Sequence, residues 1–351
     1  MAKGLWVGAL LTVLFSALCS ASTIPTLPNL CRLAIQAEGP LPENIRRYFE
    51  ENQLVPEVFD GDKHNLWDNW GAWDAEFGIY HRYSQTAGTH LGLSAIDKSA
   101  HNQAAIRHFV SADGKIWHHV GVVLEKKSPE ELAYWSGKLV VSNGRYYLFH
   151  TRGESSGENQ YIALSISRDG HRFSKSEPIL KPSQKWNYAF DDTDGAIPAW
   201  RDPEVFWHPT LNCWVMVFAT KTKESGNVGP GFGLASSVDL VNWNLLPPMS
   251  PNLPEWMRVH GAQLELPNID PTPGRVRLYA SYSVPGNDDI LGQLGTLYWE
   301  VPLLGDPLEA PKVLYNDSRF YGFSLLAGNA LLFSTDQHER PYKMASLPLQ
   351  H

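Results

Sequence analysis

The sequence is short of cysteine and, beyond its first 21 residues, has no long apolar run. Of its three cysteines, Cys19 lies within the apolar start of the chain, which leaves Cys31 and Cys213. No histidine stands at metal-ligand spacing from these two, which argues against a zinc site. In an oxidising compartment the two thiols could form one disulfide. Because nothing after residue 21 is long and apolar enough to span a bilayer, we expect no membrane association.

Charge is also scarce, at 19% of all residues. Lys and Arg number 29 against 37 Asp and Glu, for a net charge of −8. A chain of this balance lacks the basic surface that nucleic acids require, so we expect no nucleic-acid partner. The acidic stretch at 191–194 could attract calcium, but such a stretch is more often a solvated loop. We therefore expect neither a metal nor a cofactor.

The first 21 residues have the pattern of an export signal. Lys3 supplies a positive start, residues 5–18 are apolar, and residues 19–21 end in small side chains suited to cleavage before Ser22. The apolar run is short for a transmembrane anchor. We therefore expect a secreted protein, extracellular or periplasmic.

A tight-turn pattern recurs in the segments 111–117, 167–173 and 237–243. Each segment has an aspartate two residues after a serine and ends on an aromatic residue, and strand-like runs of period two flank it. This pattern predicts a β-hairpin in each copy. Further strand pairs precede each copy, so the repeating unit has four strands.

Repeated four-stranded units are typical of a β-propeller. About 330 mature residues divided by units of about 60–65 residues give roughly five blades. Helical periodicity is limited to a short segment at 42–52, after a proline. We therefore expect an all-β, single-domain protein, with an N-terminal segment at 22–60 and a five-bladed β-propeller at 61–351.

Four segments far apart in the sequence are predicted to begin the innermost strands of successive blades and to meet at one end of the central channel. They are Trp67-Asp68, Trp135-Ser136, Arg201-Asp202 and Val259-His260. A carboxylate beside an indole suits a sugar site, because the carboxylate acts on the anomeric carbon while the ring packs on the apolar face of the sugar. The sequence therefore predicts a carbohydrate substrate.

These segments resemble the invertase and levansucrase clan, glycoside hydrolase families 32 and 68, with the propellers of family 43 as more distant relatives. The resemblance covers about residues 60–300. It is carried by Trp67-Asp68-Asn69-Trp70, by Tyr134-Trp135-Ser136-Gly137 and by Arg201-Asp202-Pro203-Glu204-Val205-Phe206-Trp207. The resemblance implies a glycosidase or transglycosylase that acts on fructosides or related furanosides.

Residue by residue, the resemblance implies that Asp68 is the nucleophile and Asp202 the transition-state stabiliser. Arg201 and Ser136 would hydrogen-bond sugar hydroxyls. Two indoles, those of Trp67 and Trp135, would wall the subsite. An oxocarbenium-like transition state needs one carboxylate at the anomeric carbon and another on the ring hydroxyls, which agrees with these roles.

The general acid of the family is a glutamate that opens the innermost strand of the next blade. The alignment adopted here has His260 at that place, with Glu265 five residues further on and on the opposite alternate face, where it would contact substrate. An imidazolium titrates near neutrality, so His260 is expected to be the proton donor. His260 could equally do no more than hold a hydroxyl.

Two alternatives to an enzyme follow. A propeller without the family's acid would be a carbohydrate-binding pseudoenzyme. A protein-interaction scaffold is the third hypothesis, but a scaffold has no reason to gather Trp, Asp, Arg and Ser at the starts of its inner strands.

Overall fold

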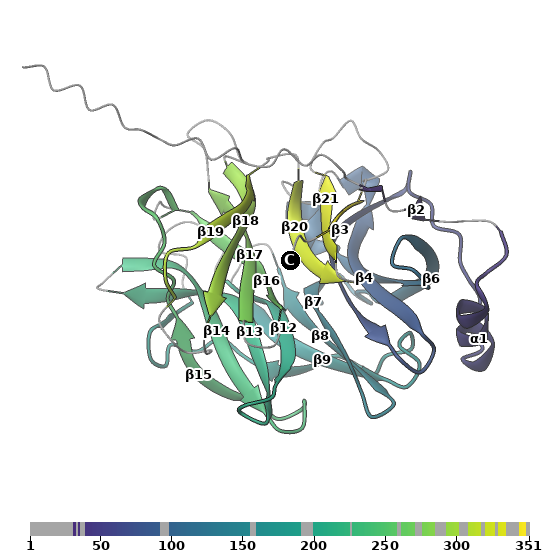
Figure 1. The fold of residues 1–351 in the computed structure, drawn as a ribbon, viewed down its shortest axis with the longest axis horizontal. Coiled ribbons are helices and arrows are strands. Elements are labelled where there is room, and N and C mark those ends of the chain that lie inside the picture. The colour runs from purple at the N-terminus through teal and green to yellow at the C-terminus, as the bar shows by residue number, and fades with distance from the viewer. Residues whose placement is uncertain are drawn as a thin grey trace, which may run out of the picture.

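The computed structural model is built mainly from strands arranged around a central axis (Figure 1). It describes residues 31–32, 34–35, 39–91, 98–154, 159–190, 199–224, 227–257, 261–270, 276–284, 293–301, 308–316, 320–326, 329–334 and 344–348. The expected export signal, the acidic stretch at 191–194 and His260 lie outside the described residues. Within the described part of the chain, no helix is long and apolar enough to cross a membrane.

The strands of the described residues form five sheets, and each sheet is one blade. Blade 1 contains β3 (His64–Asp74), β4 (Ile79–Gly88), β5 (Ala105–Ser111) and β6 (Ile116–Leu124). Blade 2 contains β7 (Ala133–Ser142), β8 (Arg145–Gly153), β9 (Gln160–Ser167) and β10 (Glu177–Leu180). Blade 3 contains β12 (Trp200–His208), β13 (Cys213–Glu224), β14 (Asn227–Ser237) and β15 (Asn244–Met249), with β11 (Tyr188–Ala189) also paired to β13.

The last two blades follow the same order. Blade 4 contains β16 (Gln263–Asp270), β17 (Val276–Val284), β18 (Gln293–Val301) and β19 (Lys312–Asn316). Blade 5 contains β20 (Phe320–Leu326), β21 (Asn329–Ser334) and β22 (Met344–Pro348). Short helical segments lie in the connections: η1 (Thr89–Leu91), α2 (Lys98–Asn102) and η2 (Glu255–Met257).

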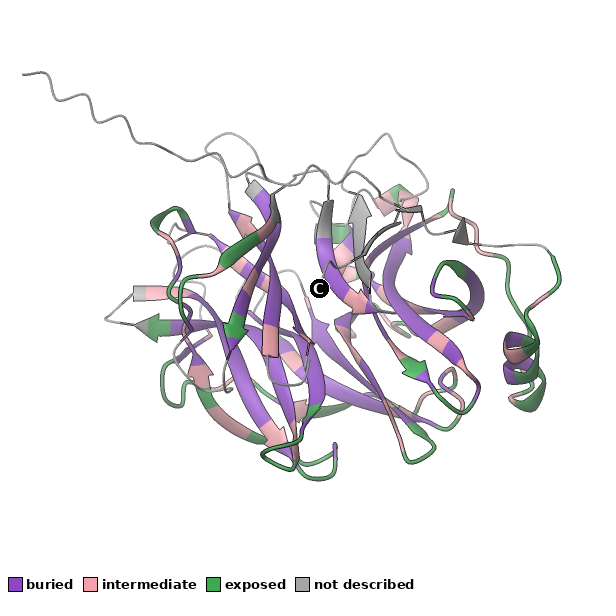
Figure 2. Cartoon of the chain, viewed as in Figure 1, coloured by how far each residue is buried: buried purple, intermediate pink, exposed green. Residues whose placement is uncertain are grey.

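The innermost strands form a closed ring. β3 contacts β7, β7 contacts β12, β12 contacts β16, β16 contacts β20, and β20 returns to β3 (Figure 1). The blades are buried along most of their strands, whereas many of their connections are exposed (Figure 2). The structure therefore confirms the predicted all-β five-bladed propeller.

Two short strands of the N-terminal segment pair with strands of the propeller. β1 (Cys31–Arg32) pairs with β22 as the outermost strand of blade 5, and β2 (Ala34–Ile35) pairs in parallel with β6 of blade 1. The chain thus joins its last blade to its first. The predicted short helix is confirmed as α1 (Glu43–Glu51), which buries Ile45, Tyr48 and Phe49 against blade 1.

The three repeated turns share one set of hydrogen bonds. In the second copy, Oγ of Ser167 donates to Oδ1 of Asp169 at 2.8 Å and accepts from the backbone N–H of Gly170 at 3.0 Å. The same carboxylate oxygen accepts from the backbone N–H groups of His171 and Arg172. The copies that begin at residues 111 and 237 repeat these bonds, so the predicted hairpins are confirmed.

The disulfide considered for Cys31 and Cys213 does not form in the structure. Cys213 is a free thiol at the start of β13, where it packs against the apolar core between blades 3 and 4.

Candidate active site

Each innermost strand contains a β-bulge close to its first residue. The residues at the five bulges are Asp68, Ser136, Asp202, Leu266 and Gly322. Four of them have a left-handed backbone, with φ of 37° at Asp68, 57° at Asp202, 52° at Leu266 and 76° at Gly322. A residue other than glycine costs about 1 kcal/mol or more in this conformation, and such strain is typical of functional sites. The bulge redirects side chains at the same level of every blade.

Arg201 is the positive centre of a charged cluster at these bulges. Its side chain is buried, with Nη2 2.8 Å and Nε 3.2 Å from Oε1 of Glu265. Its Nε also lies 3.8 Å from Oδ2 of Asp202, and Nη2 donates to Oε1 of Gln263. One guanidinium thus joins side chains of blade 3 and blade 4.

Asp68 of blade 1 belongs to the same cluster. Burial among protein atoms raises the pKa of Asp68 well above its usual value, and the negative charges of Asp202 and Glu265 raise it further. The charge of Arg201 and a hydrogen bond from Nε2 of Gln85 act in the opposite direction. Three carboxylates from three blades therefore lie close enough to repel one another.

Asp202 is held by both of its neighbouring blades. Its backbone N–H donates to Oγ1 of Thr151 at 2.9 Å, and Thr151 donates in turn to the backbone oxygen of Ser136 at 3.2 Å. The backbone N–H of Leu266 donates to Oδ2 of Asp202 at 3.2 Å, and the Ser136 side chain hydrogen-bonds the same carboxylate. Burial raises the pKa of Asp202 to about 6, although Arg201 opposes the shift.

The two indoles before the first bulges are packed inside the protein. Trp67 is 2% and Trp135 is 5% exposed, and both rings make edge contacts with His101 of α2. Nε1 of Trp135 also donates to the backbone oxygen of His101 at 2.9 Å. Both residues therefore anchor α2 to the inner strands, and their part in walling a sugar subsite stays a prediction.

The expected alignment of blade 4 is wrong. Val259-His260 was predicted to begin the inner strand, but β16 begins at Gln263 and its bulge follows Glu265. Glu265 therefore takes the place that Arg201 has in blade 3, and its side chain reaches the cluster instead of the opposite face. A proline follows the bulge residue in both blades, at Pro203 and Pro267, and this shared proline could have given the correct alignment.

Three positioning residues escaped the sequence analysis: Gln85, Thr151 and Gln263. Each acts on a neighbour in the cluster through one hydrogen bond, with Asp68, Asp202 and Arg201 as the respective partners. Gln85 and Thr151 lie on second strands and Gln263 precedes its bulge, and residue type alone carries no signal at these places. Among the described residues, no group of His, Cys, Asp or Glu is arranged to hold a metal ion.

The Thr151 hydroxyl should be required for stability at this site. Thr151→Val keeps the shape of the side chain but leaves the buried N–H of Asp202 without its acceptor. We expect the free energy of unfolding to fall by about 1–3 kcal/mol. Thr151→Ser keeps the hydroxyl oxygen, so its free energy of unfolding should fall clearly less. Urea unfolding of both variants measures the difference, and equal losses would show that the methyl packing matters instead.

The raised pKa of Asp202 predicts a pH-dependent cost to stability. Its folded pKa of about 6 exceeds the usual value of 3.8, so its contribution is most favourable below pH 4 and is lost as the pH rises through 6. Asp202→Asn should therefore raise the free energy of unfolding relative to the unaltered protein at pH 8, by about 1–3 kcal/mol. At pH 4 the two should differ little. Thermal melts across this range test it, and a difference independent of pH would contradict it.

Comparison with known proteins gives one matching family. Residues 78–299 match the model of the glycosyl hydrolases family 32 N-terminal domain, a range that includes Ser136, Arg201, Asp202 and Glu265 but begins after Asp68. An extracellular exo-inulinase of Meyerozyma guilliermondii is 27% identical over 154 residues, 39% of this chain and 26% of that protein. A levanbiose-producing levanase of Geobacillus stearothermophilus is 27% identical over 145 residues, 39% of this chain and 33% of that protein. The chain thus spans about a quarter to a third of these relatives.

Solved structures agree on the fold. A fructofuranosidase of Schwanniomyces occidentalis, solved with fructosylnystose, superposes with a TM-score of 0.61 at 17% identity, covering 85% of this chain and 58% of that one. A levansucrase of B. megaterium superposes with a TM-score of 0.61 at 14% identity, covering 88% and 93%. The family model matches well over half of the length of this chain, so the chain belongs to glycosyl hydrolase family 32.

Proposed function

We propose that this protein is a secreted glycosidase or transglycosylase that acts on fructosides. The observation that carries the proposal is the cluster of Asp68, Asp202 and Glu265 around Arg201, at the bulged starts of three inner strands. The names of similar proteins support fructosides, since they include an inulinase, a levanase, a levansucrase and a fructofuranosidase. Secretion is supported by the export-signal pattern and by the extracellular inulinase.

Asp68 suits the nucleophile. Its side chain is partly exposed, and its charged form is disfavoured by two neighbouring carboxylates when no substrate is bound. A glycosyl group that develops positive charge among these carboxylates relieves their repulsion. The cluster therefore favours the transition state over the free protein, which is the requirement for catalysis.

Asp202 suits a stabiliser that makes no covalent bond. Hydrogen bonds from Leu266 and Ser136 hold its carboxylate, and the side chain is only 6% exposed. A group fixed in this way can bind ring hydroxyls and strengthen those bonds as charge develops. Arg201 and Ser136 lie beside it and would orient the same sugar.

Glu265 is our preferred proton donor. It lies at the bulge of blade 4, and its charge acts on both Asp68 and Asp202. Its place in the cluster supports an enzyme over a binding pseudoenzyme, since that alternative rested on a missing acid. His260, three residues before β16, is the competing donor.

The nucleophile is tested by Asp68→Asn, which keeps the shape but removes the attacking charge. We expect turnover of sucrose or inulin to fall about a thousandfold or more while sugar binding changes by less than about tenfold. Initial rates and calorimetry measure the two quantities. Asp202→Asn is the comparison and should lower kcat far more than it raises KM. Near-normal turnover by the Asp68 variant would exclude it as nucleophile.

The proton donor is tested by Glu265→Gln beside His260→Gln. Loss of the acid should cripple hydrolysis of inulin, whose leaving group needs a proton, but spare an aryl furanoside, whose phenolate does not. We expect this split for Glu265→Gln and no split for His260→Gln. The reverse pattern, together with a kcat that falls as pH rises through the imidazole pKa, would assign the role to His260.

A further inference from the structure

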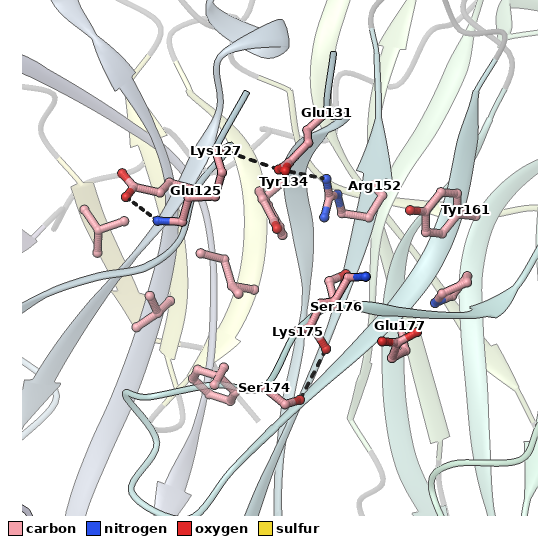
Figure 3. A pocket seen from close by; sticks show the side chains of 15 residues that line it. Glu125, Lys127, Glu131, Tyr134, Arg152, Tyr161, Ser174, Lys175, Ser176 and Glu177 are labelled. Atoms are coloured by element: carbon pink, nitrogen blue, oxygen red, sulfur yellow. Dashed lines mark hydrogen bonds and ion pairs between the residues drawn. The ribbon is translucent and has the colours of Figure 1, made fainter. Parts of the chain in front are cut away.

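A cavity of about 700 Å³ lies between blades 1 and 2 (Figure 3). Its walls come from the end of β6, the connection at 125–131, the paired strands β8 and β9, and the segment 173–178 before and within β10. Cavities of this size bind small molecules or short polymers. None of the residues that line this cavity has a role in the proposed chemistry.

The cavity is separate from the charged cluster, although one strand serves both. Neighbouring residues of a strand point to opposite faces. On β8, Thr151 reaches Asp202 of blade 3, whereas the next residue, Arg152, lines the cavity on the side of blade 1. The two sites therefore lie on opposite faces of blade 2.

The charges around the cavity cancel. Glu125, Glu131 and Glu177 oppose Lys127, Arg152 and Lys175. Nζ of Lys127 lies 2.8 Å from Oε1 of Glu125, and Nη2 of Arg152 lies 4.0 Å from Oε2 of Glu131 (Figure 3). Such a lining offers many donors and acceptors but attracts neither an anion nor a cation. It favours a neutral ligand that is rich in hydroxyl groups.

Aromatic rings supply the remaining surface. Tyr134, Tyr161 and Phe173 line the cavity from three different segments of the chain. The guanidinium of Arg152 lies 3.8 Å from the centre of the Tyr134 ring and donates to the backbone oxygen of Leu132 at 2.6 Å. The Arg152 side chain is 8% exposed, and its buried Nε has no hydrogen-bond partner among the described residues. These contacts fix the position of this wall before a ligand binds.

We propose that the cavity between blades 1 and 2 is a second saccharide-binding site, which holds a stretch of oligosaccharide away from the catalytic cluster. Aromatic rings pack on the apolar faces of sugars, and paired charged groups hydrogen-bond their hydroxyls. The proposal rests on the proposed function only in the choice of fructans as the first probe. Such a site increases the local concentration of a polymeric substrate and leaves small substrates unaffected.

The test compares Tyr161→Ala and Lys175→Ala with Trp207→Ala, which removes an exposed aromatic ring from blade 3. Hydrogen exchange of residues 122–131 and 173–178 is measured with inulin, levan, arabinan and xylan oligosaccharides. We expect protection of both segments by a fructan, and about tenfold weaker binding in Tyr161→Ala. Steady-state kinetics should show a several-fold higher KM for polymeric inulin in the two cavity variants, with unchanged kcat and KM for sucrose. The control should match the unaltered protein. Lys175 is exposed, so its variant tests the site even if Tyr161→Ala unfolds.

The outcomes separate the two proposals. If no oligosaccharide changes the hydrogen exchange of either segment, the second site is overturned, even if the protein hydrolyses fructosides. An unaltered KM for inulin in both cavity variants would also overturn it. Protection by an oligosaccharide without turnover of any fructoside would refute the proposed function and support the site. Protection by arabinan or xylan alone would support the site and change the class of sugar.

Discussion

The contact between Arg201 and Glu265, with Asp202 beside it, is the interaction on which the centre of this propeller depends. Three carboxylates that converge on one buried region repel one another, and burial itself disfavours their charge. Burial is the largest cause of the raised pKa of Asp68 and of Asp202, and the charge of Arg201 offsets only part of this rise. The free protein therefore holds the cluster at a cost, which a positively charged transition state would reduce.

The β-bulge is the backbone feature that makes this cluster attainable. In a regular strand the side chains of Asp68 and Asp202 would lie on the face opposite to those of their chain neighbours, and the backbone φ of both residues would be negative. The left-handed bulges break that alternation, and contacts from adjacent blades hold them, as Thr151 of blade 2 does for Asp202 of blade 3. A partly buried ion pair of Lys138 in blade 2 and Glu204 in blade 3, at 2.8 Å, joins the same blades further along the inner strands.

The blades use their two faces differently. Toward the next blade, blade 2 supplies Ser136 and Thr151 to the charged cluster. Toward blade 1, its Tyr134 and Arg152 line a polar cavity. Because a strand alternates its side chains, a single strand such as β8 can serve two sites without sharing a residue.

Much of the fold could be predicted from the sequence, because its signals are local. The Ser-x-Asp turns determine three hairpins through bonds within a few residues, and the length of the repeating unit, divided into the chain length, predicts the number of blades. Asp68, Ser136, Arg201 and Asp202 stood out as candidates by residue type, and the structure brings the last three into direct contact around one carboxylate.

Other features of the site depend on contacts between residues that are distant in sequence, and these the tertiary structure decided. The register of blade 4 made Glu265 a member of the cluster. A strand pattern of period two does not reveal the bulge that sets this register, although Pro267 marks its place in the sequence. Thr151 and the unpaired Cys213 acquired their environments only when blades packed together, whereas Gln85 reaches Asp68 from the next strand of the same blade. The sequence determined most of the strand pairing within each blade, because consecutive strands pair through local turns. Packing between blades determined which side chains meet at the site, because the site is built from residues of several blades.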